Sequence, residues 1–542
     1  MIRLLSTSAT ALIVAAAPVF AEVTPVQVWD TLVRAYSEGG YTVTEGSREE
    51  AGQTLTINDV TLDASNLIPA DPETAQSPTS VKLVIPRVVL NTTGDGNVRT
   101  VFEGDWTGEV SAPYEDGTPG TPVTIGVAMP SNEMITSGTP DAMNHALNYP
   151  KISAAITFRD QKGTEVPVNL IVTDTKGSYN TSGTAETGTK ADYDMTSGRA
   201  AITVDSAIPG ENGQPGGHIK ADLAMTDLAT KGSMGMPAGN FNMGEDMNAA
   251  LKAGATVAAS LGFAGYEGTA DFSGQDENGA PQSGNATFTG GRGNVDIRMD
   301  DKGVGYAGTS EAASINVTAN SIPFPLSYSA GLQSFDVHFP VMQSDTAQPF
   351  TFKYALADLT LGDAIWGLFD PTAQLPRDPA SLTIDVGGDL MVTRDVMDPE
   401  FQKRMAAAST PAEGSSELTA EQLAALETLQ AEAVPFQPVK VTLNQIALNA
   451  IGAKADLNGE LTAGPNGDFS QPAGTINGTF SGVNTLIDRL ASLGLIPQDQ
   501  VAAARMMLMV FAKPVEGQTD TLETRIEMRE DGSIFANGQQ MQ

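Results

Sequence analysis

Short segments of alternating apolar and polar residues dominate the hydrophobic pattern of this chain. Leu55 to Leu62 is LTINDVTL, and Val441 to Leu448 is VTLNQIAL. Each alternates, slips by one position, and then alternates again. Because successive side chains of a strand point to opposite faces, both apolar pairs reach one core face only if the strand bulges at the slip. The pattern therefore predicts bulged strands, and several of them side by side predict a curved sheet.

Looser versions of the pattern occur at three further places, which are Leu83 to Leu90, Leu223 to Ala229 and Tyr354 to Leu361. Their uneven spacing argues against a strict solenoid repeat. The close likeness of the first two octets is compatible with a duplicated β unit, and equally with chance similarity in a β-rich chain. The sequence leaves both interpretations open.

Asp-Gly and Asn-Gly pairs separate many of the alternating segments. Such pairs supply the positive φ angles that two-residue hairpin loops need. The 55 glycines of the chain fit the same picture. The pairs are Asp95-Gly96, Asp116-Gly117, Asn278-Gly279, Asn466-Gly467 and Asp531-Gly532. They predict that most of the protein is antiparallel β structure.

Helical spacing occurs in only a few places. Thr24 is a candidate N-cap before Pro25, and the helix that follows is expected to end at Gly39-Gly40. Further helices are expected at 245–261, 363–369 and 398–407 and, as a helical hairpin, from Ile487 to Gly494 and from Pro497 to Phe511. Together the patterns predict an α+β fold, predominantly β, in which curved antiparallel sheets carry a few packed helices.

The segment 408–438 is the best candidate for a linker, because it is poor in aromatic residues and rich in Ala, Glu, Ser and Thr. Within it, Thr419 and Gln422 form a capping-box pattern. An exposed acidic helix and a disordered tether both fit this composition. The other expected regions are a signal peptide at 1–21, an N-terminal β-rich region at 22–240, a middle helix-plus-β region at 241–407 and a C-terminal α+β unit at 439–542.

The first residues resemble a secretory signal peptide. Arg3 precedes an apolar run from Leu12 to Ala17, and the segment ends on small residues at Ala21. Cleavage between Ala21 and Glu22 is expected to release a periplasmic or secreted protein. No later run reaches the roughly 18 apolar residues that a membrane span needs. The sequence thus predicts no transmembrane anchor after cleavage.

The formal net charge of -35 bears on partners, and the lack of cysteine bears on attachment. Nucleic acids and anionic membrane surfaces are bound through clustered Lys and Arg, so this acidic chain is not expected to bind either. The chain cannot carry the lipid-modified cysteine of a lipoprotein. A cysteine-free exported protein must also be held together by burial and hydrogen bonds.

No catalytic, metal or cofactor motif is evident in the chain. The three histidines, His145, His218 and His338, lie far apart, and none has ligand spacing to a second histidine. The acidic pairs Asp276-Glu277 and Asp300-Asp301 stand beside glycine, as hairpin tips do. We therefore expect no metal site, no cofactor and no enzymatic activity.

Methionines gather at two places. Met234, Met236, Met243 and Met247 form one group, and Met506, Met507 and Met509 form the other. Thioether clusters bind copper in some periplasmic carriers. Core packing around helices is the more ordinary use of methionine, and it is our prediction for both groups.

The most distinctive string of the chain runs from Trp366 to Ala380. Its characteristic residues are Trp366, Asp370, Pro371, Leu375, Pro376, Arg377 and Pro379. The string resembles the exported alphaproteobacterial family catalogued as domain of unknown function 2125, and the opening helix and closing hairpin are similar to that family too. The resemblance implies export and no established activity. From the residues alone, the prolines end a short helix, and Arg377 is expected to pair with Asp370 or Asp378.

The repeated bulged strands also resemble AsmA-like envelope proteins, whose β-rich grooves are associated with lipids. The repeated slipped strands and the export signal lead to one hypothesis, a non-enzymatic protein whose curved sheets bury an apolar groove that binds a lipid or another envelope component. A structural or interaction protein of the envelope is the alternative. A hydrolase of envelope polymers that uses Asp or Glu is the third, and it would require a cleft with two carboxylates and a raised pKa.

Overall fold

We describe the protein from a computed structural model. The residues that it describes are 23–38, 41–68, 79–111, 120–159, 164–184, 186–208, 210, 216–239, 241, 246–275, 279–409, 419, 422–424, 435–465, 467 and 469–541. The expected signal peptide and its cleavage site at Ala21 and Glu22 lie outside these residues. So does most of the expected linker.

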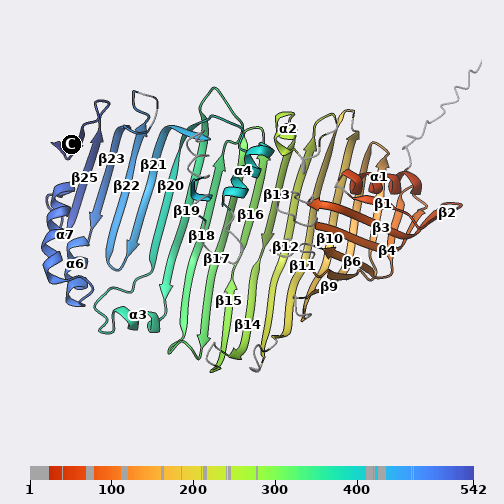
Figure 1. The fold of residues 1–542 in the computed structure, drawn as a ribbon, viewed down its shortest axis with the longest axis horizontal. Helices are drawn as coiled ribbons and strands as arrows, with labels where there is room; N and C mark the ends of the chain where they lie inside the picture. Colours follow the sequence, from red (N-terminus) through yellow and green to blue (C-terminus); the bar gives the residue numbers. More distant parts are fainter. Residues whose placement is uncertain are drawn as a thin grey trace, which may run out of the picture.

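The described chain forms one curved antiparallel sheet of 27 strands, in which the strands follow one another across the molecule (Figure 1). Helix α1 (Pro25–Glu38) lies at the N-terminal end of the sheet. The strands of this end are β1 (Thr42–Thr44), β2 (Ser47–Ala51), β3 (Thr54–Ile68), β4 (Thr79–Thr92), β5 (Val98–Glu103), β6 (Trp106–Ser111), β7 (Val123–Ala128), β8 (Glu133–Thr139) and β9 (Ala142–Arg159). The predominantly β fold with curved antiparallel sheet and a few helices is confirmed.

The middle of the sheet is made of long strands. They are β10 (Glu165–Thr184), β11 (Gly188–Ile208), β12 (Gly217–Met236), β13 (Thr256–Phe263), β14 (Gly265–Gln275), β15 (Pro281–Gly290), β16 (Gly293–Asp300), β17 (Gly303–Ala319), β18 (Leu326–Phe339), β19 (Gln348–Leu361) and β20 (Ala380–Val392). Three short helices accompany them, namely α2 (Met247–Lys252), α3 (Asp363–Phe369) and α4 (Pro399–Ser409).

The C-terminal end continues the same sheet. Its strands are β21 (Phe436–Ala450), β22 (Ala453–Thr462), β23 (Ala473–Ser481), β24 (Lys513–Pro514), β25 (Thr521–Met528), β26 (Ile534–Ala536) and β27 (Gln539–Gln540). Between β23 and β24 the chain forms the predicted helical hairpin, which consists of α6 (Val483–Ser492) and α7 (Gln498–Phe511). The sheet is continuous across the expected region boundaries, since β12 pairs with β13 and β14, and β20 pairs with β21.

The slips in the hydrophobic pattern are kinks in the strands. Asp59, Asp227 and Asp358 have left-handed backbone conformations inside β3, β12 and β19, with φ of 54°, 49° and 55°. Asp and Asn are the non-glycine residues that adopt this conformation at least cost. In the octet that ends at Leu448, the β21–β22 register shifts instead. The predicted irregularity in these strands is confirmed.

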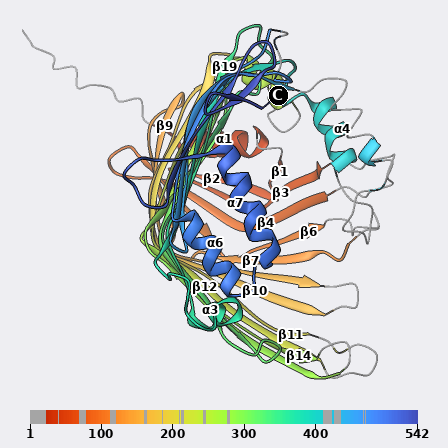
Figure 2. The same cartoon turned by 90° about the vertical axis from the view of Figure 1, so that its left-hand side faces the viewer.

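The kinks form a line across the sheet. Asp174 of β10 and Asp227 of β12 flank Gly198 of β11 at the same level of the register. Further along, β13 and β14 are two halves of one strand broken at Ala264, because both pair with β12. Each long strand thus bends near its middle, and the sheet wraps into an arch when seen end-on (Figure 2). The side chains change face at the same line, so the apolar residues of both halves reach the concave side.

The N-terminal helix forms as the sequence predicts. Thr24 Oγ1 accepts a hydrogen bond from Gln27 N (3.3 Å), and Gln27 Oε1 accepts one from Thr24 N (3.0 Å), which makes a capping box. The helix buries Val28 and Trp29 against β3 and β4. Its described residues end at Glu38, and Gly39-Gly40 lies outside the described chain.

The helix expected at 245–261 is wrong in its second half. Only Met247–Lys252 is helical, and Thr256–Phe263 is strand β13. The helix ends because Gly254 takes a positive φ of 102°. The segment that follows then finds open backbone partners on both β12 and β16, and this pairing overrides its helical spacing.

The predicted hairpins are present where the structure describes them. Antiparallel pairs β4–β5 and β25–β26 flank Asp95-Gly96 and Asp531-Gly532. Gly279 and Gly467 also have positive φ between paired strands. Asp116-Gly117, Asn278 and Asn466 lie outside the described residues. In the expected linker, Thr419 and Gln422 do form the capping box, and strand β21 begins at Phe436, before the expected boundary at 438.

Candidate binding site: an apolar trough

The concave side of the sheet is an apolar face that runs across the molecule. Directly paired residues share a face, so the register identifies its members. The lower row lies on the side of the kink line that leads to the β14–β15 hairpin. It contains Ala154, Leu170, Ile202, Leu223, Gly268, Phe288, Ile315, Tyr328 and Leu361. The upper row lies on the other side of the kink line and contains Leu147, Gly177, Met195, Thr230, Leu261, Val295, Gly308, Phe335, Tyr354, Ile384, Ile446, Leu457, Gly478 and Thr524. Neither row contains a charged residue.

The opposite face of the same strands is polar. The row next to Phe335 on this face contains Ser178, Asp194, Lys231, Ser260, Asp296, Ala307, Asp336, Lys353, Asp385 and Gln445. Cross-strand ion pairs join its members, as between Lys231 Nζ and Asp194 Oδ2 (3.0 Å). The charges of the sheet are therefore sorted to the convex side, where water solvates them.

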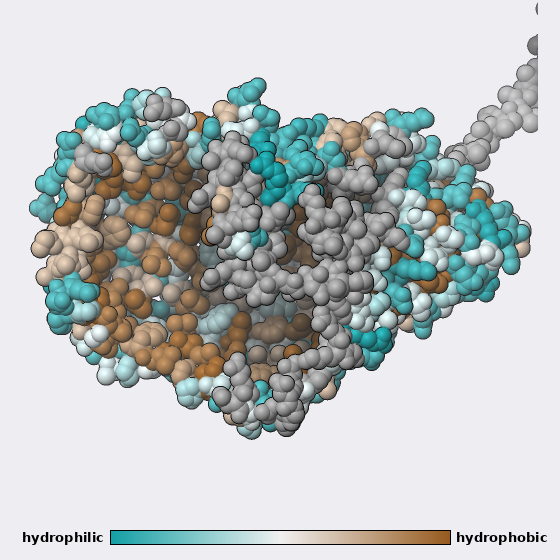
Figure 3. Space-filling view, in the orientation of Figure 1, coloured by the Kyte–Doolittle hydropathy of each residue, from teal (hydrophilic) through white to brown (hydrophobic). Residues whose placement is uncertain are grey.

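Large apolar side chains on the concave face remain exposed. Phe335 and Phe352 are 39% and 40% exposed, and Phe272 and Tyr306 are exposed to a similar degree. The space-filling view shows hydrophobic residues gathered in a hollow on this side of the molecule, most plainly over the C-terminal strands (Figure 3). Soluble proteins rarely leave so large an apolar patch without a function. We call this hollow the trough and treat it as the candidate binding site.

Glycines opposite aromatic residues shape the floor of the trough. A Cβ added to Gly268 would come within 2.1 Å of Phe288 Cζ, so that ring lies over the glycine backbone. The same close approach recurs at five more glycines, which are Gly290 under Tyr266, Gly284 under Phe272, Gly232 under Tyr193, Gly293 under Phe263 and Gly308 under Phe335. Rings that lie along the sheet leave the space above them open. The sequence reasoning missed this pairing, although the spacing of Gly and aromatic residues along neighbouring strands contains it.

Helices close the apolar face at its ends. At the N-terminal end, α1 covers Leu55, Ile57 and their neighbours and forms a buried core. A second core lies at one rim of the sheet, where Ala250, Leu251 and Ala255 of the α2 segment meet Val304 and Val341. At the C-terminal end, α6 and α7 lie on the concave side (Figure 2). The trough is the length of the face between these covers.

His145 marks the border between the closed end and the trough. Its side chain is fully buried, its Nδ1 lies 2.8 Å from Thr136 Oγ1, and its ring stacks on Tyr179. Its Nε2 has no hydrogen-bond partner in the described structure. Burial lowers the pKa of His145 to about 4, so the imidazole is neutral at neutral pH. The residue serves as a packed member of the apolar face.

The other two histidines lie on separate parts of the polar side. His218 Nε2 lies 2.8 Å from Asp205 Oδ1. His338 pairs in the register with Gly305 and Thr351, and its pKa is lowered mainly by partial burial. The structure does not bring the three histidines together. Among the described residues, no group of three or more His, Asp or Glu side chains could hold a metal ion.

Carboxyl groups with altered pKa values do not favour the hydrolase hypothesis. The described carboxyl groups whose pKa departs from its ordinary value are Asp95, Asp395, Asp520 and Asp531, and each pKa is lowered. At Asp395, burial acts to raise the pKa, and hydrogen bonds from Lys252, Gln343 and Asn248 outweigh it. Asp300 accepts a hydrogen bond from Lys302 N at the β16–β17 hairpin tip, as a solvated turn does.

The string from Trp366 to Ala380 forms a tight corner after α3. Asp370 is fully buried, and its carboxylate accepts hydrogen bonds from Gln374 N (2.8 Å) and Leu375 N (2.9 Å). Trp366 and Leu375 are buried beside it. After Pro371, Pro376 and Pro379 the chain continues into β20 at Ala380. These contacts stabilise the corner between α3 and β20, which is a structural role for the string.

Arg377 does not pair with the carboxylate of Asp370, and Asp378 is not its partner either. Its Nη1 donates to Asp363 Oδ1 (3.0 Å) and its Nη2 to the Asp370 carbonyl (3.3 Å), while the guanidinium stacks over Trp366. The expected pairing is wrong because the Asp370 carboxylate is already taken by the two backbone amides that follow it. Arg377 instead joins the first turn of α3 to the end of the helix.

The methionine prediction is correct in part. Met236 and Met247 pack against the second core, Met234 is exposed in the trough, and Met243 lies outside the described residues. Met506 and Met509 on α7 are 67% and 77% exposed, and Met507 is exposed as well. Core packing is therefore wrong for the C-terminal group. Helix α7 has no buried residue, so its methionines are not packed in a core.

In the described part of the chain, none of the helices combines the length and the hydropathy that a bilayer-crossing helix requires. Comparisons with protein-family models, with curated proteins and with solved structures gave no match for this chain. The family resemblance of the string from Trp366 to Ala380 stays a prediction.

Proposed function

We propose that this protein is an exported, non-catalytic binding protein that holds lipids or comparable amphiphiles by their acyl chains in the trough. The observation that carries the proposal is the sorting of side chains. A chain with a net charge of -35 has an apolar concave face whose two central rows lack any charge. Exposed apolar surface costs free energy in water, and an acyl chain that covers it removes this cost.

The chemistry of the floor supports a hydrocarbon ligand over a polar one. Phe, Tyr, Val, Ile and Leu side chains offer dispersion contacts and no fixed hydrogen-bond pattern. Such a floor does not select a precise shape, which suits flexible chains. A polymer substrate with many hydroxyl groups would find few partners here.

The length of the trough supports more than one chain per protein. Neighbouring strands lie about 4.8 Å apart, so the upper row from Leu147 to Thr524 extends over roughly 60 Å. The hydrocarbon core of a whole bilayer is only about 30 Å thick. We expect several acyl chains to lie across or along the face at once.

Mass spectrometry of organic extracts tests the proposal. The mature protein is purified without detergent from the native cells and compared with an unrelated acidic periplasmic protein. Co-purified lipid at one or more molecules per protein is the expected result. Its absence from repeated gentle preparations would leave the interaction-protein alternative ahead.

A matched pair of variants locates the bound lipid. Phe335→Asp places a charge on the trough floor, whereas Ser334→Asp places the same charge one residue away on the polar face. We expect Phe335→Asp to reduce the bound lipid severalfold and Ser334→Asp to leave it unchanged, because burying an unpaired carboxylate under an acyl chain is costly. Equal lipid in both variants would contradict binding in the trough.

A further inference from the structure

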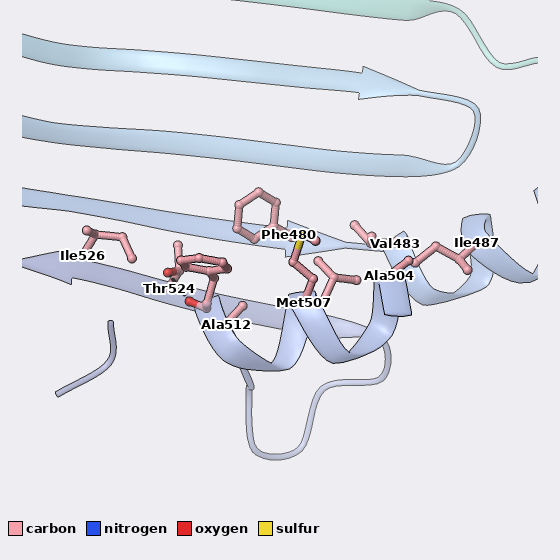
Figure 4. Close-up of a pocket in the computed structure, with 10 residues that line it drawn as sticks. Phe480, Val483, Ile487, Ala504, Met507, Ala512, Thr524 and Ile526 are labelled. Atoms are coloured by element: carbon pink, nitrogen blue, oxygen red, sulfur yellow. Dashed lines mark hydrogen bonds between the residues drawn. The ribbon is translucent and has the colours of Figure 1, made fainter. Parts of the chain in front are cut away.

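A pocket lies at the C-terminal end of the trough, between the helical hairpin and the sheet (Figure 4). Its volume is about 480 Å³, within the range of small-molecule sites. Its lining comes from β23, α6, α7 and β25 and consists of Phe480, Val483, Ile487, Ala504, Met507, Leu508, Phe511, Ala512, Thr524 and Ile526. The close-up shows strand residues on one side of the pocket and helix residues on the other.

The floor of this pocket is the last part of the trough floor. Thr524 ends the upper row described above, through Gly478 and Leu457. Ile526 pairs with Ile476 on the same face, two residues further along β25. A chain lying on the apolar face can therefore continue under α6 and α7 without meeting a charged position on the strands.

The pocket offers no free polar group among the residues that line it. Thr524 has the one side-chain hydroxyl there, and it already donates to the Phe511 carbonyl. A carboxylate or phosphate would lose its hydration in this pocket and gain nothing in return, which is costly. A hydrocarbon end, in contrast, gains dispersion contacts and gives up no hydrogen bond.

Different contacts hold the two helices, α6 and α7, that cover the pocket. Asp520 fixes the start of α6, because its carboxylate accepts from Asn484 N (3.1 Å), Thr485 N (2.9 Å) and Thr485 Oγ1 (2.7 Å). Helix α7 has no buried residue. Its last residue is tied to the sheet, because the Phe511 carbonyl accepts hydrogen bonds from Thr524 Oγ1 and from Asn537 Nδ2 (3.0 Å). The rest of α7 is tied to α6 by the exposed ion pair between Arg505 and Asp488 (2.6 Å). Exposed pairs contribute little stability, so this part of α7 can yield to admit a chain.

We propose that this pocket receives the terminal methyl end of an acyl chain whose remaining length lies in the trough. This proposal rests on the proposed function and adds an orientation to it. The tail end is clamped under α6 and α7, and the polar head lies toward β19 to β21.

Photocrosslinking tests the orientation with the full mature protein. One fatty acid carries a diazirine at its methyl end, and a second carries it next to the carboxyl group. We expect the first to label peptides that contain Ile487 and Met507 and the second to label β19 to β21, because an extended fatty acid reaches across only four or five strands at about 4.8 Å each. A phosphatidylcholine with the same methyl-end diazirine shows whether the chain comes from a phospholipid or from a free fatty acid, since labelling of the pocket by only one of them identifies the source.

The outcomes separate this proposal from the one on which it rests. Labelling confined to the middle strands by both fatty acids would overturn the orientation and leave trough binding in place. No saturable labelling by any probe would overturn both. Labelling of the pocket by the carboxyl-end probe as strongly as by the methyl-end probe would also overturn the orientation.

A pair of variants on α7 provides the control. Ala504→Phe fills the pocket, and Ala503→Phe puts the same ring on the neighbouring, exposed position. We expect Ala504→Phe to reduce methyl-end labelling of the Ile487 peptide severalfold, and Ala503→Phe to leave it at the level of the unchanged protein. Circular dichroism of both variants checks that the hairpin remains folded. Equal labelling in folded variants would contradict the clamp.

Discussion

The two ends of one apolar face differ in what covers them. At the N-terminal end, Trp29 of α1 is 0% exposed against β3 and β4, and the face is a closed core. Over the middle strands, Phe335 and Phe352 lie on the same face of the sheet as the strand residues that α1 covers, but these two rings stay exposed. The strand pattern is the same in both regions. The covering helix is therefore what turns an open apolar face into a core.

Truncation of one large ring in each region gives the largest contrast. Trp29→Ala is expected to lower the free energy of unfolding by about 3–5 kcal/mol, because it empties a packed site. Phe335→Ala is expected to cost at most about 1 kcal/mol, since its ring is already in contact with water. Urea unfolding measures both. Similar losses would mean that the trough is as closed as the core.

The pH dependence of stability tests His145, which lies at the border between the two regions. The pKa of His145 is lowered to about 4 from an ordinary 6.5, so the folded state binds the proton more weakly than the unfolded state. Stability from this group is present above pH 6.5 and is lost as the pH falls toward 4, by up to about 3 kcal/mol. A His145→Gln variant lacks this part of the pH dependence. If both proteins lose the same stability between pH 7 and pH 4, His145 is not buried in its neutral form.

Substitution at the kink line tests what curves both regions. A Cβ on Gly331 would lie 2.8 Å from the Asp358 carboxylate, so Gly331→Val is expected to cost about 1–3 kcal/mol. Adding Asp358→Ala removes the clashing group, and a left-handed alanine already occurs at Ala312. The double variant should regain part of the loss. Strictly additive losses would show that the two residues do not meet.

The smallest effect on stability is expected on the trough floor. Gly268→Val pushes the Phe288 ring up into the trough, where space is open, and valine favours the strand. We expect a stability change of about 1 kcal/mol or less, together with a clear loss of bound lipid in the extraction assay. The same substitution at Gly126, where an added Cβ meets nothing within 4 Å, is the control. A loss of bound lipid in both variants would mean that displacement of the Phe288 ring is not its cause.

Much of the fold was predictable because it depends on local chemistry. The slipped alternation at Asp59 and Asp358 predicted irregular strands, and the turn pairs predicted hairpins. The capping box at Thr24 and the prolines around α7 predicted helices. The errors came where the hydrogen-bond partners available in the folded chain decided the outcome. Strand pairing converted Thr256–Phe263 from helix to strand, and the buried amides of Gln374 and Leu375 took the carboxylate expected for Arg377.

The sequence by itself determined the curved antiparallel strands, because alternation, slips and turns act over a few residues each. It also determined that one face would be apolar and the other charged. Only the tertiary structure decided which parts of the apolar face are covered, since this depends on where α1, α6 and α7 pack on the sheet. For the same reason, the exposure of Met506 and Met509 and the pocket beneath α7 could not be foreseen from spacing alone.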